Sequence, residues 1–338
     1  MHIKSANAKL IDTAFILCKL PVVYKHFLPG WTGFNITILK KKSTPTLSLI
    51  GYLPVLEANS TQISTVNAIL SRSIDMADKL GLDELVLVFD QAIYAKAQQI
   101  RWKENIFKQR LVIRLGEFHI SMAYLAILGK RFKDAGLSNI MIESGLVAEG
   151  SINVVMNGKH YDRSIRAHKL VFEALSRLLW MTFFDSLSDN QYHQYLEVIK
   201  NIYDLYISSQ FEKEEFPSAF IEMTKHFDKF INENSVNNAT FAFWISYLDM
   251  VGLLLKFVRA TRTADWDLHL VSIEAMIPWF FAYDRVNYAR YLPVYLFEML
   301  NLEVTHPLIH ERLLDGDFVA QRQNTHGFSG TALDQVIE

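Results

Sequence analysis

Residues 85–126, LVLVFDQAIYAKAQQIRWKENIFKQRLVIRLGEFHISMAYLA, contain the pattern that decides the predicted fold. The apolar run Leu85–Phe89 is typical of a strand buried on both faces, and Asp90 follows it directly. A helical segment, Gln91–Trp102, leads to a second apolar run, Leu111–Leu115, which ends in GEFH. This order predicts strand, helix, strand and helix, with polar side chains where the strands end. Open α/β sheets hold ligands and catalytic groups at that edge.

Asp90 has two interpretations. A carboxylate at a strand end is an oxygen ligand suited to Mg²⁺ or Mn²⁺ in two-metal nucleotidyl transfer. An aspartate directly before a helix is also a good N-terminal cap, because its carboxylate accepts a hydrogen bond from a backbone N–H of the first turn. Taken alone, the residue favours the cap.

The second strand ends in the pattern Gly116-x-x-His119, and a helical pattern follows it. A strand-end acid followed by a helix, a strand and this motif is similar to the middle of RNase H-like transposases of the Mutator and hAT types. The resemblance implies that His119 supports a catalytic site. A lone histidine near a helix start is more often a capping or packed residue.

The RNase H-like resemblance also implies a first acid on the opening strand. Two β-rich runs, Phe34–Leu39 and Thr46–Leu53, predict an opening hairpin. However, Glu57 is the only carboxylate between Asp12 and Asp75, so it is a poor candidate for the missing metal ligand. With this ligand missing, a protein that has kept the fold without the activity fits the pattern equally well.

The resemblance further implies a third acid on a helix that follows an all-helical insertion. Glu338, at the end of DQVIE, is the candidate, and Asp334 lies one turn earlier on the same helical face. Asp90 and Glu338 would then hold the metal ions, with Glu57 as the doubtful third ligand and His119 in support.

The chain is predicted to be helix-dominated, with a mixed-sheet α/β core resembling RNase H. We expect the core at residues 1–136, a helical lobe or insertion at 137–305, and a return to the core at 306–338. Strand patterns are nearly absent between residues 160 and 305, whereas GDFVAQRQ near the end predicts one more strand. The long helices are predicted at Arg163–Phe184, Gln191–Ile207, Pro217–Ile231, Thr240–Arg262, Trp266–Tyr283 and Val286–Asn301.

Composition excludes several classes of protein. Half of the residues are hydrophobic, which excludes wholesale disorder, and the net charge of -2 carries no polyelectrolyte signature. The single cysteine, Cys18, excludes an internal disulfide framework, makes a disulfide-linked partner unexpected and suits an intracellular location. The apolar stretch Ile245–Val258 is interrupted by charges and falls short of a membrane span, so no membrane association is expected.

One block combines aromatic residues with arginines. Residues 279–299, WFFAYDRVNYARYLPVYLFEM, include Arg285 and Arg290. Aromatic and arginine side chains can stack on and clamp single-stranded nucleic acid. A contact between two helices with a kink at Pro293 is the alternative, and the block favours it.

Six segments resemble members of an uncharacterised, multi-copy family of animal proteins that look transposon-derived. In similar proteins the last segment continues beyond the position of Glu338, so the resemblance implies a C-terminal truncation. The segments are PGWTGFN (Pro29–Asn35), VFDQAIYAKA (Val88–Ala97), LGKRFKDAGL (Leu128–Leu137), ESGLVAEGS (Glu143–Ser151), FAYDRVNYARYLPVYL (Phe281–Leu296) and TALDQVIE (Thr331–Glu338).

The leading hypothesis is therefore a transposase-derived, RNase H-like protein related to DNA-processing enzymes, inactive or incomplete in this copy. If it is active, it would use Mg²⁺ or Mn²⁺ on DNA and work in the nucleus. The alternative is a non-enzymatic protein that binds another protein or a nucleic acid.

Overall fold

The computed structural model describes residues 2–22, 28–31, 33–35, 46–207, 216–324 and 327–335. The chain is helix-dominated, as predicted, and divides into two compact units. The helical unit comprises Met1–Ser43 and Leu128–Lys256, and the mixed unit comprises Thr44–Ile127 and Phe257–Glu338. These divisions differ from the predicted ones after residues 136 and 305.

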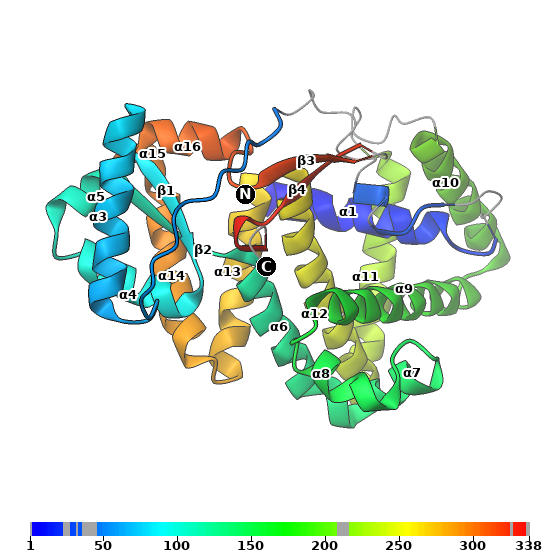
Figure 1. Cartoon of the computed structure of the whole chain (residues 1–338). Helices are drawn as coiled ribbons and strands as arrows, with labels where there is room; N and C mark the ends of the chain where they lie inside the picture. Colours follow the sequence, from blue (N-terminus) through cyan, green and yellow to red (C-terminus); the bar gives the residue numbers. More distant parts are fainter. Residues whose placement is uncertain are drawn as a thin grey trace. The chain divides into compact units, whose positions relative to one another are not determined.

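The mixed unit contains the predicted pair of strands. β1 (Leu85–Phe89) and β2 (Leu111–Leu115), cyan in Figure 1, pair in parallel with Leu85 opposite Leu111 and Phe89 opposite Leu115. The Gly116 N–H donates to the Phe89 carbonyl at 2.9 Å and continues this ladder past the end of β2. The prediction that Leu85–Phe89 is buried on both faces is wrong, because β1 is half-buried; β2 is the fully buried strand of the pair.

Three helices precede and join these strands, and α4 (Gln91–Arg101) among them lies at the predicted position. α3 (Ile63–Leu80) ends at Gly81, whose φ of 66° lies in the left-handed region that favours glycine. Asn59 does not cap this helix; its side chain accepts from the Thr61 N–H at 2.9 Å and forms a turn ahead of it. α4 (Gln91–Arg101) and α5 (Asn105–Arg110) connect β1 to β2.

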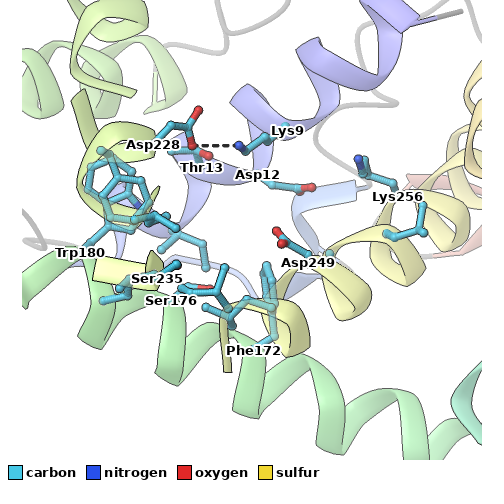
Figure 2. Close-up of a pocket in the computed structure, with 18 of the residues that line it drawn as sticks. Lys9, Asp12, Thr13, Phe172, Ser176, Trp180, Asp228, Ser235, Asp249 and Lys256 are labelled. Atoms are coloured by element: carbon cyan, nitrogen blue, oxygen red, sulfur yellow. Dashed lines mark hydrogen bonds and ion pairs between the residues drawn. The ribbon is translucent and has the colours of Figure 1, made fainter. Parts of the chain in front are cut away.

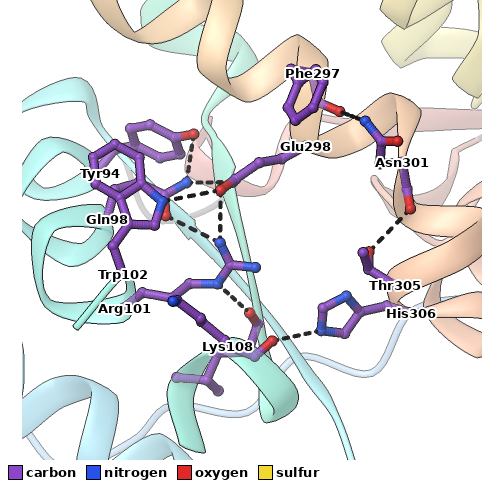
Figure 3. Close-up of polar contacts among 11 residues, drawn as sticks. Tyr94, Gln98, Arg101, Trp102, Lys108, Phe297, Glu298, Asn301, Thr305 and His306 are labelled. Carbon is purple, nitrogen blue, oxygen red and sulfur yellow. Dashed lines mark hydrogen bonds and ion pairs between the residues drawn. The ribbon is translucent and has the colours of Figure 1, made fainter. Parts of the chain in front are cut away.

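A polar network explains why helices predicted for the helical lobe belong to the mixed unit (Figure 3). Glu298 on α14 (Val286–Leu300) accepts from Gln98 Nε2 at 2.6 Å and from Arg101 Nη1 at 2.8 Å. Both donors lie on α4, and Arg101 Nε also donates to the Leu111 carbonyl at 3.0 Å. One carboxylate thus connects α14 to α4, and Arg101 extends the connection to β2.

The first predicted hairpin is wrong where the structure describes it. Residues 46–57 have no regular secondary structure, so Thr46–Leu53 is not a strand. Within it, the Ser48 N–H donates to the Gln321 carbonyl at 3.2 Å, and Ser48 Oγ accepts from the Gln321 N–H at 2.9 Å. Of Phe34–Leu39, residues 34 and 35 are helical and residues 36–39 lie outside the described residues.

The late strand near residue 320 is confirmed. β3 (Ala320–Asn324) pairs antiparallel with β4 (Gly327–Thr331), which the sequence analysis did not identify. The short 3₁₀ helix η3 (Leu333–Gln335) follows β4 and lies against β1. The other helices of the mixed unit are α13 (Trp266–Ala282), α15 (Leu302–Thr305) and α16 (Pro307–Leu314).

The helical unit is built on an aromatic core. Trp180 on α9 (Tyr161–Asp185) stacks on Phe227 of α11 (Ser218–Asn237), with ring centroids 3.6 Å apart and planes 9° apart. Phe183 packs edge-on against Phe227. The predicted long helices of this unit are all present. The elements are α1 (His2–Cys18), η1 (Lys133–Ala135), α7 (Leu137–Glu143), η2 (Glu149–Ser151), α8 (Ile152–Met156), α9 (Tyr161–Asp185), α10 (Asp189–Ile207) and α11 (Ser218–Asn237).

Two helices contain residues of both units, α6 (Glu117–Phe132) and α12 (Ala239–Thr263). Among the described helices, α12 alone is long and apolar enough to cross a membrane by length and composition. Its most apolar stretch has a mean hydropathy of 1.6 and is 44% buried within the protein. Core helices of soluble proteins meet the same criterion, so α12 is weak evidence for a membrane span.

Candidate functional site

Asp90 caps the helix that follows β1. Its backbone is extended (φ −63°, ψ 168°), and its Oδ1 accepts from the Ile93 N–H at 2.9 Å. This is the capping geometry that the sequence favoured, and such caps stabilise a helix by about 1 kcal/mol.

Asp334 and His119 meet at the beginning of α6. The Asp334 carboxylate accepts from the backbone N–H groups of Phe118 and His119, each at 3.2 Å. Asp334 Oδ2 also lies 3.1 Å from His119 Nδ1, and the side chain of Asp334 is only 6% exposed. The first N–H groups of a helix have no partner within it, and the positive end of the helix dipole favours an anion there. Asp334 therefore supplies the N-terminal cap of α6 from a distant part of the chain.

Gly116 makes this approach sterically feasible. A Cβ atom at this position would collide with the Asp334 carboxylate. The glycine of the Gly116-x-x-His119 motif thus leaves room for the carboxylate, and His119 binds it with both its backbone and its ring.

The hydroxyl of Tyr288 on α14 interacts electrostatically with both Asp90 and Asp334. Burial raises the pKa of its hydroxyl, the negative charges of Asp90 and Asp334 raise it further, and Arg285 opposes them. Asp90 directly follows β1 and Asp334 binds the first turn after β2, so the two carboxylates share the edge at which these parallel strands end. We refer to Asp90, His119 and Asp334 as the strand-edge cluster.

A buried ion pair lies next to the cluster. Arg114 on β2 pairs with Glu117 at the start of α6, and their side chains are 0% and 2% exposed. Burial raises the pKa of Glu117 to about 7, while Arg114 opposes that shift and Asp334 adds to it. Arg114 also donates to the Phe318 carbonyl at 2.9 Å and lies over the ring of Trp266. Glu117 is thus held by Arg114 in the interior of the protein.

The expected metal ligands do not assemble into a metal site in the part of the chain that the structure describes. There, no group of three or more His, Cys, Asp or Glu residues could hold a metal ion. Glu57 is exposed on the irregular segment ahead of α3. Glu338 lies outside the described residues. Of the predicted residues, Asp90 and His119 share the strand edge, and Asp334 joins them there.

The aromatic–arginine block is mainly a packing element. α13 and α14 pack against each other, and Tyr291 and Tyr295 are buried against Tyr94 at centroid distances of 5.9 and 6.4 Å. Arg285 is half-buried at the start of α14, and Arg290 is exposed. This arrangement agrees with the helix–helix alternative, although Arg290 remains accessible to a partner.

Asp334 is the cluster residue whose role the sequence analysis did not identify. The sequence places it only one turn before Glu338 on the same predicted helical face. Two signals pointed to it, namely the acid in TALDQVIE and the glycine immediately before α6. Neither signal indicates pairing with His119, because 215 positions separate the two residues.

A family model described as a domain of unknown function (DUF8702) matches residues 30–338. Searches of curated proteins and of solved structures found no match. Since the family model covers nearly the whole sequence, the chain belongs to the DUF8702 family.

Proposed function

We propose that this chain is a non-enzymatic, transposase-derived protein that acts by binding another protein. In this proposal the strand edge of an RNase H-like core keeps a structural role. There Asp334 connects the C-terminal segment to α6 by hydrogen bonds, and we call this contact a structural joint. The DNA-processing chemistry of that fold is lost.

The hydrogen bonding of Asp334 is the observation that carries the proposal. Each of its carboxylate oxygens accepts a backbone N–H of α6, and one also contacts the His119 ring. The backbone donors cannot rotate away, because they belong to the first turn of a helix. A metal ion would have to compete with these donors for the carboxylate lone pairs.

The remaining donor set also fits a metal poorly. Asp90 already accepts from the Ile93 N–H, and Glu117 is paired with Arg114 in the interior. Mg²⁺ requires near-octahedral oxygen coordination. Asp90, which caps α4, and Asp334, which is hydrogen-bonded to α6, have few lone pairs left to supply it. We therefore assign no catalytic step to Mg²⁺ or Mn²⁺ here.

An exposed apolar segment supports the binding of a partner protein. Leu49, Tyr52 and Val55 are 100%, 85% and 88% exposed on the irregular segment that precedes α3. Single exposed apolar side chains are common, but contiguous ones mark interaction surfaces.

Site-specific photo-crosslinking in cells tests partner binding. A photoreactive amino acid in place of Tyr52 should give discrete adducts with the same protein in repeated experiments. The matched control replaces Lys79, which is exposed on α3 of the same unit, and should give none. Equal adducts at both positions, or none at Tyr52, would contradict a binding role for this segment.

A cleavage assay tests the non-enzymatic part of the proposal. The full chain with single- or double-stranded DNA and Mg²⁺ or Mn²⁺ should give no cleavage above that of Asp90→Ala. Metal-dependent cleavage by the wild type that disappears in Asp90→Ala would establish the catalytic alternative. Binding of uncut DNA that is weakened by Arg290→Ala and by salt would instead favour the nucleic-acid-binding alternative.

A further inference from the structure

Two cavities of about 440 Å³ each lie within the helical unit, and both fall within the size range of small-molecule sites, about 300–1,000 Å³. The first lies among α1, α9, α11 and α12 (Figure 2). Acidic and basic side chains both line it, and Lys9 pairs with Asp228 at 3.0 Å, so its charges do not indicate which ligand it would bind. The second lies between residues 145–151 and the first turns of α9, and its charges have one sign.

The second cavity carries only positive charge among the described residues that line it. Its charged residues are Arg163 and Arg166, and none of the described lining residues is an aspartate or a glutamate. The two arginines are three positions apart on α9, a spacing that places side chains on the same face of a helix. Both guanidinium groups are therefore available to one ligand in this cavity.

Neither arginine has a partner in the part of the chain that the structure describes. Both side chains are exposed, and no ion pair or hydrogen bond joins Arg163 or Arg166 to another described residue. Asp162, the neighbour of Arg163, does not line the cavity. Arg163 also lies in the first turn of α9, where the positive end of the helix dipole adds to its charge. The cavity thus has a positive potential that no carboxylate in its described lining offsets.

Further lining residues suit the rest of an anionic ligand. Ser151 is half-buried, and its hydroxyl has no hydrogen-bond partner among the described residues. A serine hydroxyl can donate to an anion. Leu146 and Leu170 line the same cavity and are 37% and 38% exposed, so apolar surface lies beside the arginines. The lining therefore combines three polar donor groups with an apolar surface.

We propose that this second cavity binds an organic phosphate monoester. The phosphate accepts hydrogen bonds from Arg163, Arg166 and Ser151, and the apolar body packs against the two leucines. Guanidinium groups bind phosphate oxygens through strong, charge-assisted hydrogen bonds. A phosphate monoester carries a charge of about −1.5 to −2 at neutral pH, which matches the charge of two arginines. A cation is disfavoured, because no carboxylate in the described lining would balance it.

Three probes with the same apolar body and different head groups test the charge preference. Phenyl phosphate, phenyl sulfate and phenol are titrated into the full chain by isothermal calorimetry, above the second pKa of the phosphate. Phenyl sulfate has the single charge of a nucleic-acid phosphodiester, and phenol is neutral. Phenyl phosphate should bind more tightly than phenyl sulfate and at least tenfold more tightly than phenol. No binding of phenyl phosphate, or binding of phenyl sulfate or phenol that is equally tight, would overturn the proposal.

Two matched variants test the position of the phosphate. Arg166→Gln should weaken the binding of phenyl phosphate at least tenfold and leave the binding of phenol unchanged. Arg177→Gln removes an arginine from α9 outside the cavity and should have no effect. Equal affinity of the wild type and of Arg166→Gln for phenyl phosphate, with both folded by circular dichroism, would exclude this site.

Discussion

At the scale of the residue, Gly116 controls the contact between Asp334 and α6. Its missing side chain is what admits the carboxylate, because a Cβ would overlap it. The need for glycine at this position therefore comes from Asp334, a residue far away in the sequence. Asp90 was predicted as a metal ligand, with a helix cap as the alternative, and the structure shows the cap. The cap could be foreseen because capping depends on neighbours only a few positions away.

Gly116→Ala should lower the free energy of unfolding by about 2 kcal/mol, because the added methyl group displaces Asp334 from the helix N-terminus. Urea denaturation followed by circular dichroism measures the change. Gly150→Ala is the control, since a Cβ there meets no atom within 4 Å, and it should be neutral or slightly stabilising. Equal effects of the two substitutions would refute the steric account.

His168 on α9 predicts a pH effect in the helical unit. It is buried with Nδ1 3.0 Å from the Tyr247 hydroxyl, and burial lowers its pKa to about 4 from 6.5. Below pH 6.5 the unfolded chain binds a proton that the folded histidine does not bind until about pH 4. The contribution of His168 to the free energy of unfolding is therefore fully present above pH 6.5. It is lost as the pH falls toward 4, which lowers the free energy of unfolding by roughly 3 kcal/mol.

Chemical denaturation of the wild type and of His168→Gln between these pH values measures that contribution. The variant should be less stable at neutral pH, and its stability should fall less on acidification. His160→Gln, at an exposed position before α9, is the control and should retain the wild-type pH profile. An unchanged profile in His168→Gln would show that another group is responsible.

At the scale of the element, helices were predicted well and strands less well. The long helices have amphipathic periods and local stop signals, so their positions follow from short-range sequence. Thr46–Leu53 has strand-like residues, but strand formation depends on a neighbour with which to pair. β4 shows the reverse case, because its glycine-rich sequence has low strand propensity and tertiary contacts hold it in place. A Cβ at Gly330 would collide with the Thr261 carbonyl, and Arg262 donates to the Gly330 carbonyl at 3.0 Å.

The connection between α4 and α14 also belongs to this scale. Glu298→Ala should lower the free energy of unfolding by about 3 kcal/mol, because it leaves Arg101 without its ion-pair partner and removes one acceptor from the fully buried Gln98. Thermal and urea unfolding measure the loss. Glu303→Ala, at an exposed site on α15, should change stability by less than about 0.5 kcal/mol. A loss no larger than that of the control would mean that the network adds little.

At the scale of the whole molecule, the helix-dominated composition and the parallel strand pair were predictable from the sequence. The division into units was not, because it depends on contacts such as Glu298 with Arg101, which 197 positions separate. The candidate site was predicted in part for the same reason. Asp90 and His119 follow neighbouring strands, so local sequence patterns place them. Asp334 reaches them only through a tertiary contact between distant parts of the chain.

The central claim is that Asp334 serves as a structural joint rather than as a catalytic metal ligand. Catalytic carboxylates are often held at a cost to stability, so removing their charge leaves a protein equally or more stable. A carboxylate that caps a helix has the opposite effect, because its removal leaves helix N–H groups without an acceptor.

The most direct test is the free energy of unfolding of Asp334→Asn, measured by urea denaturation with and without Mg²⁺. Asp83→Asn, at an exposed position in the same unit, is the control. We predict that Asp334→Asn loses about 2 kcal/mol relative to the wild type, equally in both conditions. Two results together would contradict the structural role. Without Mg²⁺ the variant would be as stable as the wild type, and added Mg²⁺ would stabilise the wild type but not the variant.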